Sequence, residues 1–210
     1  MNFDTAYEIT GTVPEELLAA VTDQIEKTLA DADYNYQDRD VENRRLSWMR
    51  LDFMKPPEDP DKQPLYESIL AVINHIIDNY DIDPLNSVSV SMLKPRQVLA
   101  EHTDGRFIHR ITNRYLVPLT KSDVNYMYGY VNKEKVQWVL EYGKVYRINN
   151  AIIHSAINAE DRERYTLLID TWDPRLKAKF KDHKDLFAAM VILGVNYEFE
   201  KRLKIGPKVR

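Results

Sequence analysis

The spacing of hydrophobic residues divides the chain into a helical part and a β part. Between residues 12 and 80, apolar side chains recur at helical intervals in two stretches. The first follows Thr12-Val13-Pro14-Glu15, where threonine and glutamate stand at capping-box spacing, and the second follows Pro64. From residue 87 onward, apolar residues alternate with polar ones or form short runs, which is typical of strands. The pattern predicts helices over about residues 12–80 and a β core over about residues 87–172.

The β core is expected to hold about eight short strands. They are predicted at residues 88–92, 97–101, 114–119, 124–131, 136–141, 144–148, 152–157 and 164–171. This density of strands favours an antiparallel sandwich or jelly roll over strand–helix–strand units. One more strand is predicted at residues 46–54, between a polar, irregular stretch at 31–45 and a proline-rich break at 55–60.

The helical pattern returns at the C-terminal end of the chain. Asp173 and Pro174 provide a cap and a first-turn proline, apolar positions continue to Val191, and a basic tail follows. We therefore predict a C-terminal helix and tail over residues 174–210. Since no linker, repeat or low-complexity tract divides the sequence, residues 1–210 are expected to form a single α+β domain. Its mainly β core would be flanked by N-terminal and C-terminal helices.

Composition narrows the possible chemistry. The 210 residues include five histidines and no cysteine, so any metal site must use nitrogen and oxygen ligands. With 29 basic and 33 acidic residues, the formal net charge is −4, and no nucleic-acid partner is expected. The first ten residues lack the features of a secretory signal, and no run approaches the roughly 20 apolar residues of a membrane span. We expect a cytoplasmic protein without a membrane partner.

His102, Asp104 and His154 are the candidate metal ligands. In a strand, side chains two positions apart share a face, so His102 and Asp104 can point into one cavity. A histidine from a neighbouring strand would complete a set of two imidazoles and one carboxylate, which suits non-haem Fe(II) with open coordination positions. The H-x-D motif alone is common by chance, and an exposed loop with a hydrogen-bonded histidine is the alternative.

Arg164 is the candidate anion-binding residue. It precedes an apolar run, Tyr165 to Ile169, so its guanidinium can point inward from a core strand. A buried arginine needs an anionic partner, and a carboxylate fits its planar fork. Thr166 lies two residues on, on the same face, and can add a hydroxyl to the same carboxylate. An ordinary salt bridge between Arg164 and an acidic residue of the protein is the alternative.

These residues together resemble a known family. The pattern runs through H-T-D at 102–104, Arg114, Pro118, His154, Arg164 and Asp170-Thr171-Trp172-Asp173-Pro174. Nine residues separate His154 from Arg164, and five separate Arg164 from Asp170. The pattern is similar to that of the aspartyl/asparaginyl β-hydroxylase superfamily, which includes bacterial hydroxylases of free proline. The resemblance covers about residues 88–174. It implies a double-stranded β-helix, a jelly roll of the cupin-like kind, and Fe(II)- and 2-oxoglutarate-dependent dioxygenase activity.

The resemblance also implies roles for individual residues. His102, Asp104 and His154 match the catalytic iron ligands, and Arg164 matches the anchor for the distal carboxylate of 2-oxoglutarate. Arg114 matches an arginine that lies in the same pocket and helps to bind carboxylate. One departure stands two residues after Arg114, where some peptide-acting members have a histidine and this chain has Leu116.

The implied reaction consumes O2 and converts 2-oxoglutarate to succinate and CO2 while an amino acid, free or within a peptide, is hydroxylated. Two other functions remain open at the level of sequence. One is a non-catalytic cupin-like module that binds or senses a small acid. The other is a metal-dependent hydrolase or isomerase, which would work without oxygen and tolerate Zn(II).

Some residues near the motif have two interpretations. Tyr126, Tyr128 and Tyr130 alternate and should share one face of a strand, where they either pack or form an aromatic wall of a substrate pocket. His109 is either exposed or contacts substrate from a loop over the cavity. His75 and His183 are expected to have no metal role.

Overall fold

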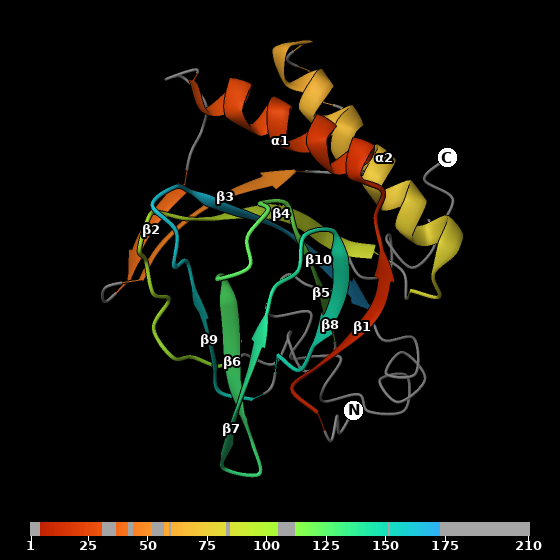
Figure 1. Ribbon diagram of the computed structural model, residues 1–210. Helices are drawn as coiled ribbons and strands as arrows, with labels where there is room; N and C mark the ends of the chain where they lie inside the picture. Colours follow the sequence, from red (N-terminus) through yellow and green to blue (C-terminus); the bar gives the residue numbers. More distant parts are fainter. Residues whose placement is uncertain are drawn as a thin grey trace, which may run out of the picture.

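The computed structural model describes residues 5–30, 37–41, 44–51, 57–58, 60–82, 85–104, 112–150 and 152–172. Within these ranges, two helices cover one face of a large sheet, and a smaller sheet lies on its other side (Figure 1). The predicted C-terminal helix and tail at 174–210 lie outside the described residues, as do His109 and His183.

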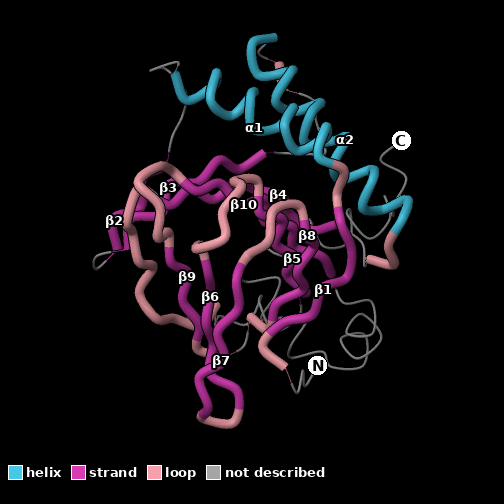
Figure 2. The backbone as a smooth tube through the Cα atoms, viewed as in Figure 1, coloured by secondary structure: helices cyan, strands magenta, loops and turns pink. Residues whose placement is uncertain are grey.

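The large sheet has seven strands, and every pair in it is antiparallel. In spatial order these are β1 (Tyr7–Thr12), β8 (Lys144–Ile148), β5 (Thr112–Pro118), β10 (Arg164–Trp172), β4 (Leu85–Leu93), β3 (Arg44–Leu51) and β2 (Gln37–Val41). The small sheet contains β7 (Glu134–Val139), β6 (Tyr126–Val131) and β9 (His154–Ile157), again antiparallel (Figure 2). The arrangement is the expected double-stranded β-helix.

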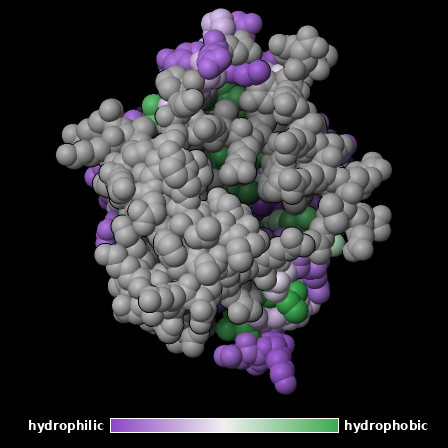
Figure 3. All heavy atoms as spheres, turned by 180° about the vertical axis from the view of Figure 1, so that it is seen from behind, coloured by the Kyte–Doolittle hydropathy of each residue, from purple (hydrophilic) through white to green (hydrophobic). Residues whose placement is uncertain are grey.

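Helices α1 (Glu15–Ala30) and α2 (Gln63–Asn79), the latter preceded by a short 3-10 helix η1 (Pro60–Lys62), pack on the outer face of the large sheet. Leu18, Val21 and Ile25 of α1 are fully buried at helical spacing, as the sequence pattern predicted. They form one core with Val90 of β4 and Leu167 of β10. In the view from behind, hydrophilic residues gather at the top of the molecule, where the helices lie (Figure 3).

The central strands bury both faces, and this alternation creates the site. On β10, Tyr165, Leu167 and Ile169 belong to the core beneath the helices. The intervening positions Arg164, Thr166 and Leu168 face the space between the two sheets. A second core fills part of that space, with buried members Leu93, Leu116, Met127, Trp138, Tyr146 and Ile148.

Three strand predictions differ from the structure. Residues 97–101 form no strand. Two isolated bridges occur there instead, Val98 with Ile157 inside the range and His102 with His154 directly after it. The stretch 31–45 was predicted to be irregular, yet β2 lies within it and β3 begins there at Arg44. β1 was not predicted. β1 and β2 are the two edge strands of the large sheet. An edge strand buries little apolar surface, so its hydrophobic alternation is weak, and β1 has no buried residue.

Within the described residues, no helix combines the length and the apolar character that crossing a bilayer requires.

Candidate metal centre

Two histidines are brought together by a single bridge between the segment before β5 and the start of β9. The backbone N–H of His102 donates to the carbonyl of His154 (3.0 Å), and the N–H of His154 donates to the carbonyl of His102 (2.8 Å). This reciprocal pair places the imidazole rings side by side, with centroids 4.5 Å apart. His154 also lies opposite Gly129 of β6, so the small sheet supports it from the other side.

Each imidazole is oriented by a backbone carbonyl two residues earlier. His102 Nδ1 lies 2.8 Å from the carbonyl oxygen of Ala100, and His154 Nδ1 lies 2.9 Å from that of Ile152. A carbonyl oxygen only accepts, so each Nδ1 carries the proton and each Nε2 keeps a free lone pair. This is the outer hydrogen bond that metal-binding histidines usually make.

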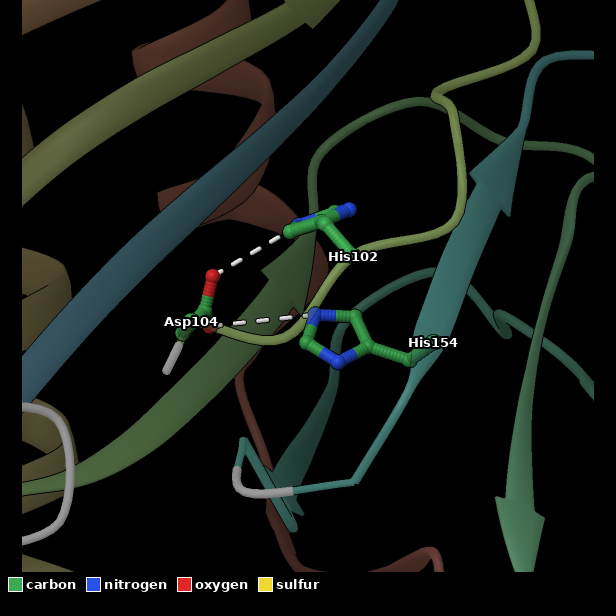
Figure 4. A group of neighbouring side chains, drawn as sticks. All are labelled: His102, Asp104 and His154. Carbon is green, nitrogen blue, oxygen red and sulfur yellow. Dashed lines mark ion pairs between the residues drawn. The ribbon is translucent and has the colours of Figure 1, made fainter. Parts of the chain in front are cut away.

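Asp104 completes the cluster. Its Oδ1 lies 3.5 Å from His102 Nε2 and its Oδ2 lies 3.7 Å from His154 Nε2, as the dashed lines of Figure 4 mark. One ligand atom from each of the three residues falls within 4.8 Å of the others. The backbone N–H of Asp104 donates to the carbonyl of Asn150, which fixes the residue beside β9. The three residues predicted as ligands therefore come together.

The charges of the cluster suit a divalent cation. Burial raises the pKa of Asp104, but nearby Arg114 and the two histidines outweigh it and hold this pKa well below its usual range. Burial lowers the pKa of His154, an effect that Asp104 opposes only in part. At neutral pH, Asp104 is therefore a carboxylate and His154 is a neutral imidazole, and His102 lies beside them. Two imidazoles and one carboxylate with further positions open fit non-haem Fe(II).

A cavity of about 110 Å³ adjoins the cluster, between the two sheets. Its apolar wall includes Leu93, Leu99, Leu116, Met127, Ile148 and Leu168. Leu116, the position where some relatives have a histidine, is therefore part of this wall. The polar groups of the cavity, apart from the ligands, are few: Ser91, Arg114, Arg164 and Thr166. A small pocket with apolar walls and a few convergent polar groups is typical of a small-molecule site.

Arg164 lies in this cavity with almost no solvent exposure (4%). Its Nη1 donates to the carbonyl of Ile157 (2.9 Å), and among the described residues no carboxylate is close enough to pair with it. Burial lowers the pKa of Arg164 to about 10, so the side chain stays charged at neutral pH. Thr166, also buried, lies two residues along the same face of β10. The salt bridge to a protein acid that was the alternative for Arg164 is not found in the described part of the chain.

Arg114 also lines this cavity, where it pairs with two carboxylates of the protein. Its Nη1 donates to Asp104 Oδ2 (2.7 Å), while Nε and Nη2 donate to the two oxygens of Asp170 (2.7 and 2.9 Å). Burial lowers the pKa of Arg114, but the two carboxylates raise it further than burial lowers it. Asp170 was part of the family pattern, yet no role for it follows from the sequence.

The three tyrosines of β6 do not line the cavity, because Met127, between them, faces inward. Tyr128 and Tyr130 instead donate to the exposed carboxylate of Glu101 (2.9 Å each). All three are half-buried, and the interpretation as a wall of this cavity is not supported. His75 lies on α2, where Nε2 is 3.2 Å from the carbonyl of Thr12, away from the metal cluster.

Comparison with known proteins identifies one family and several solved structures of similar fold. The family model of the aspartyl/asparaginyl β-hydroxylases matches residues 10–174. No curated protein sequence matches the chain.

Three solved structures illustrate the similarity in fold. The carbocyclase SnoK of nogalamycin biosynthesis is 16% identical, with a TM-score of 0.60 over 81% of this chain and 80% of that one. A prolyl hydroxylase from Trichoplax adhaerens, in complex with a peptide, is 11% identical, with a TM-score of 0.60 over 82% and 86%. A prolyl-4-hydroxylase from Pseudomonas putida is 13% identical, with a TM-score of 0.55 over 80% and 92%. At these identities the similarity shows a common fold.

Proposed function

The chain belongs to the aspartyl/asparaginyl β-hydroxylase family and is a 2-oxoglutarate-dependent hydroxylase, and we propose that it hydroxylates an amino acid, free or within a peptide. His102, Asp104 and His154 would hold Fe(II), and Arg164 with Thr166 would hold the distal carboxylate of 2-oxoglutarate. The observation that carries the proposal is the pairing of two features in one cavity. A metal-ligand cluster lies at one part of it, and a buried arginine without a carboxylate partner lies at another.

The bound iron and 2-oxoglutarate would supply the oxidation chemistry, in which O2 is consumed and 2-oxoglutarate is converted to succinate and CO2 as a substrate C–H bond is hydroxylated. The residues of the chain have simpler tasks. His102 and His154 would present their Nε2 atoms to the metal, and the carbonyls of Ala100 and Ile152 fix the direction of the two rings. Arg164 orients the cosubstrate by its charge, and the apolar wall excludes water from the reacting groups.

The substrate class is proposed from the family, whose name refers to amino-acid side chains. Proteins of similar fold include a prolyl hydroxylase in complex with a peptide and a carbocyclase of nogalamycin biosynthesis, so the fold alone does not select between a peptide and a small molecule as substrate. We also propose that the chain forms one domain, because the family match spans the helical part and the β core together.

Succinate formation from 2-oxoglutarate tests the proposal without knowledge of the substrate. The Fe(II)-loaded protein should form succinate slowly and only with iron and O2. His102→Ala and Asp104→Ala should lose this activity, whereas His75→Ala, which changes a histidine outside the site, should retain it. Tight metal and 2-oxoglutarate binding without succinate, across a broad set of amino acids and peptides, would favour a binding or sensing module. Turnover of a substrate without O2 and with Zn(II) would favour a hydrolase or isomerase.

A further inference from the structure

One arginine joins a metal-ligand carboxylate to a second carboxylate that has no place in the metal centre. We call Asp104, Arg114 and Asp170 the Arg114 cluster. Arg114 gives its Nε–Nη2 edge to both oxygens of Asp170 and a single N–H, from Nη1, to Oδ2 of Asp104. All three side chains are largely buried, with exposed fractions of 15% for Arg114, 11% for Asp104 and 13% for Asp170.

The register of the large sheet holds this cluster in place. Asp170 of β10 lies directly opposite Arg114 of β5 in the antiparallel ladder. Both strands lie in the interior of the sheet, since β5 is flanked by β8 and β10, and β10 by β5 and β4. Directly opposed residues lie close together on one face, so the strands themselves place the carboxylate of Asp170 beside the guanidinium. Arg114 is therefore aimed at Asp104 by a partner on a rigid strand.

We propose that Asp170 is a positioning residue that acts through Arg114 to set the coordination of Asp104; this inference rests on the proposed iron site. Arg114 donates to Oδ2 of Asp104, which lies 3.7 Å from His154 Nε2, and Oδ1, 3.5 Å from His102 Nε2, would be the oxygen left to bind the metal. Asp170 occupies the forked edge of Arg114, which would otherwise pair with a carboxylate through two hydrogen bonds. Without Asp170, that edge is free to take both oxygens of Asp104 and compete with the metal.

The net charge of the Arg114 cluster also supports a role of Asp170 in metal binding. Two carboxylates and one guanidinium sum to a net charge of −1, which attracts a divalent cation into a buried site. Loss of the Asp170 charge leaves Arg114 and Asp104 with a sum of zero next to the cation. Both effects predict that a change at Asp170 weakens metal binding.

Calorimetric titration of the cofactor-free protein with Co(II) tests this role. The substitution Asp170→Asn keeps the shape of the side chain and removes its charge. We expect its Co(II) dissociation constant to rise about 10- to 100-fold, the range usual for outer partners of metal ligands. The matched control is Asp161→Asn, because Asp161 binds Arg96 with the same two-point geometry (2.7 and 2.8 Å) on the surface. The control should bind Co(II) like the wild type.

Unchanged affinity in Asp170→Asn, or an equal loss in Asp161→Asn, would overturn the positioning role. A wild-type protein that binds no Co(II), or a His102→Ala variant that binds it normally, would instead overturn the iron site itself. If thermal unfolding shows that Asp170→Asn does not fold, Arg114→Lys serves in its place, since one ammonium cannot hold both carboxylates in this geometry. When both single variants fold, the double variant should lose no more affinity than the larger single loss, because both changes break one connection. Additive losses would contradict the proposal.

Discussion

Two arginines line the same cavity, and their surroundings are opposite. Arg164 is almost completely buried and contacts a backbone carbonyl, with no carboxylate partner in the described part of the chain. Arg114 contacts two carboxylates, one of them a candidate metal ligand. Asp170, which lies opposite Arg114, is on the same strand as Arg164, six residues away, which is about 20 Å.

The difference in partners suggests different roles for the two arginines, ligand binding for Arg164 and structural support for Arg114. A buried charge without a carboxylate partner costs free energy of folding, and we propose that for Arg164 a ligand supplies the anion. A buried charge with two partners stabilises the fold and leaves little attraction for a third carboxylate. We infer that Arg164 is available to 2-oxoglutarate, and that Arg114 orders the metal site.

The largest expected effect is on stability, from removal of the paired arginine. Arg114→Met should lower the free energy of unfolding of the metal-free protein by about 3–5 kcal/mol, because Asp104 and Asp170 are left buried without a cation. Urea denaturation measures this change. The control Arg96→Met removes an exposed pair and should leave the free energy of unfolding almost unchanged. If Arg114→Met lowers the free energy of unfolding no more than the control does, the contrast between Arg114 and Arg164 does not hold.

Removal of the other arginine should act on the ligand. Arg164→Met loses charge-assisted hydrogen bonds to the cosubstrate, each worth about 1.5–3 kcal/mol, so 2-oxoglutarate should bind about 100-fold more weakly. Calorimetry on protein loaded with Mn(II) gives the affinity without turnover. Metal affinity should stay the same, in contrast to the effect of a change at Asp170. Unchanged 2-oxoglutarate affinity would mean that another group holds the distal carboxylate.

The smallest expected effect is a gain in stability, from the loss of the unpaired arginine charge. Without ligand, Arg164→Met should raise the free energy of unfolding by roughly 1 kcal/mol, because it replaces a buried, unpaired charge by an apolar side chain of similar length. Thermal and urea unfolding of the cofactor-free protein measure this gain. A clear loss of stability would show that the charge of Arg164 is satisfied inside the protein.

Much of this site could be predicted from sequence because its signals are local. His102 and Asp104 share a face by the two-residue period of extended chain, and so do Arg164 and Thr166. The helical stripes were equally clear, since α1 and α2 bury one face each. Edge strand β1 gave a weak signal because none of its residues is buried.

The roles of Arg114 and Asp170 depend on long-range register. They are 56 positions apart, and only the pairing of β5 with β10 shows that they lie opposite each other. The face on which the β6 tyrosines lie also depends on long-range strand register. Alternation predicted a shared face, but which face turns to the cavity depends on how β6 pairs with β9.

The most direct test of the site is an anaerobic titration of the Fe(II)-loaded protein with 2-oxoglutarate, followed by visible absorption. We predict a weak charge-transfer band that rises to saturation at one 2-oxoglutarate per protein and that is absent in Asp104→Ala. No band in the wild type, together with no heat of 2-oxoglutarate binding by calorimetry, would contradict the assignment of this cavity as an iron and 2-oxoglutarate site.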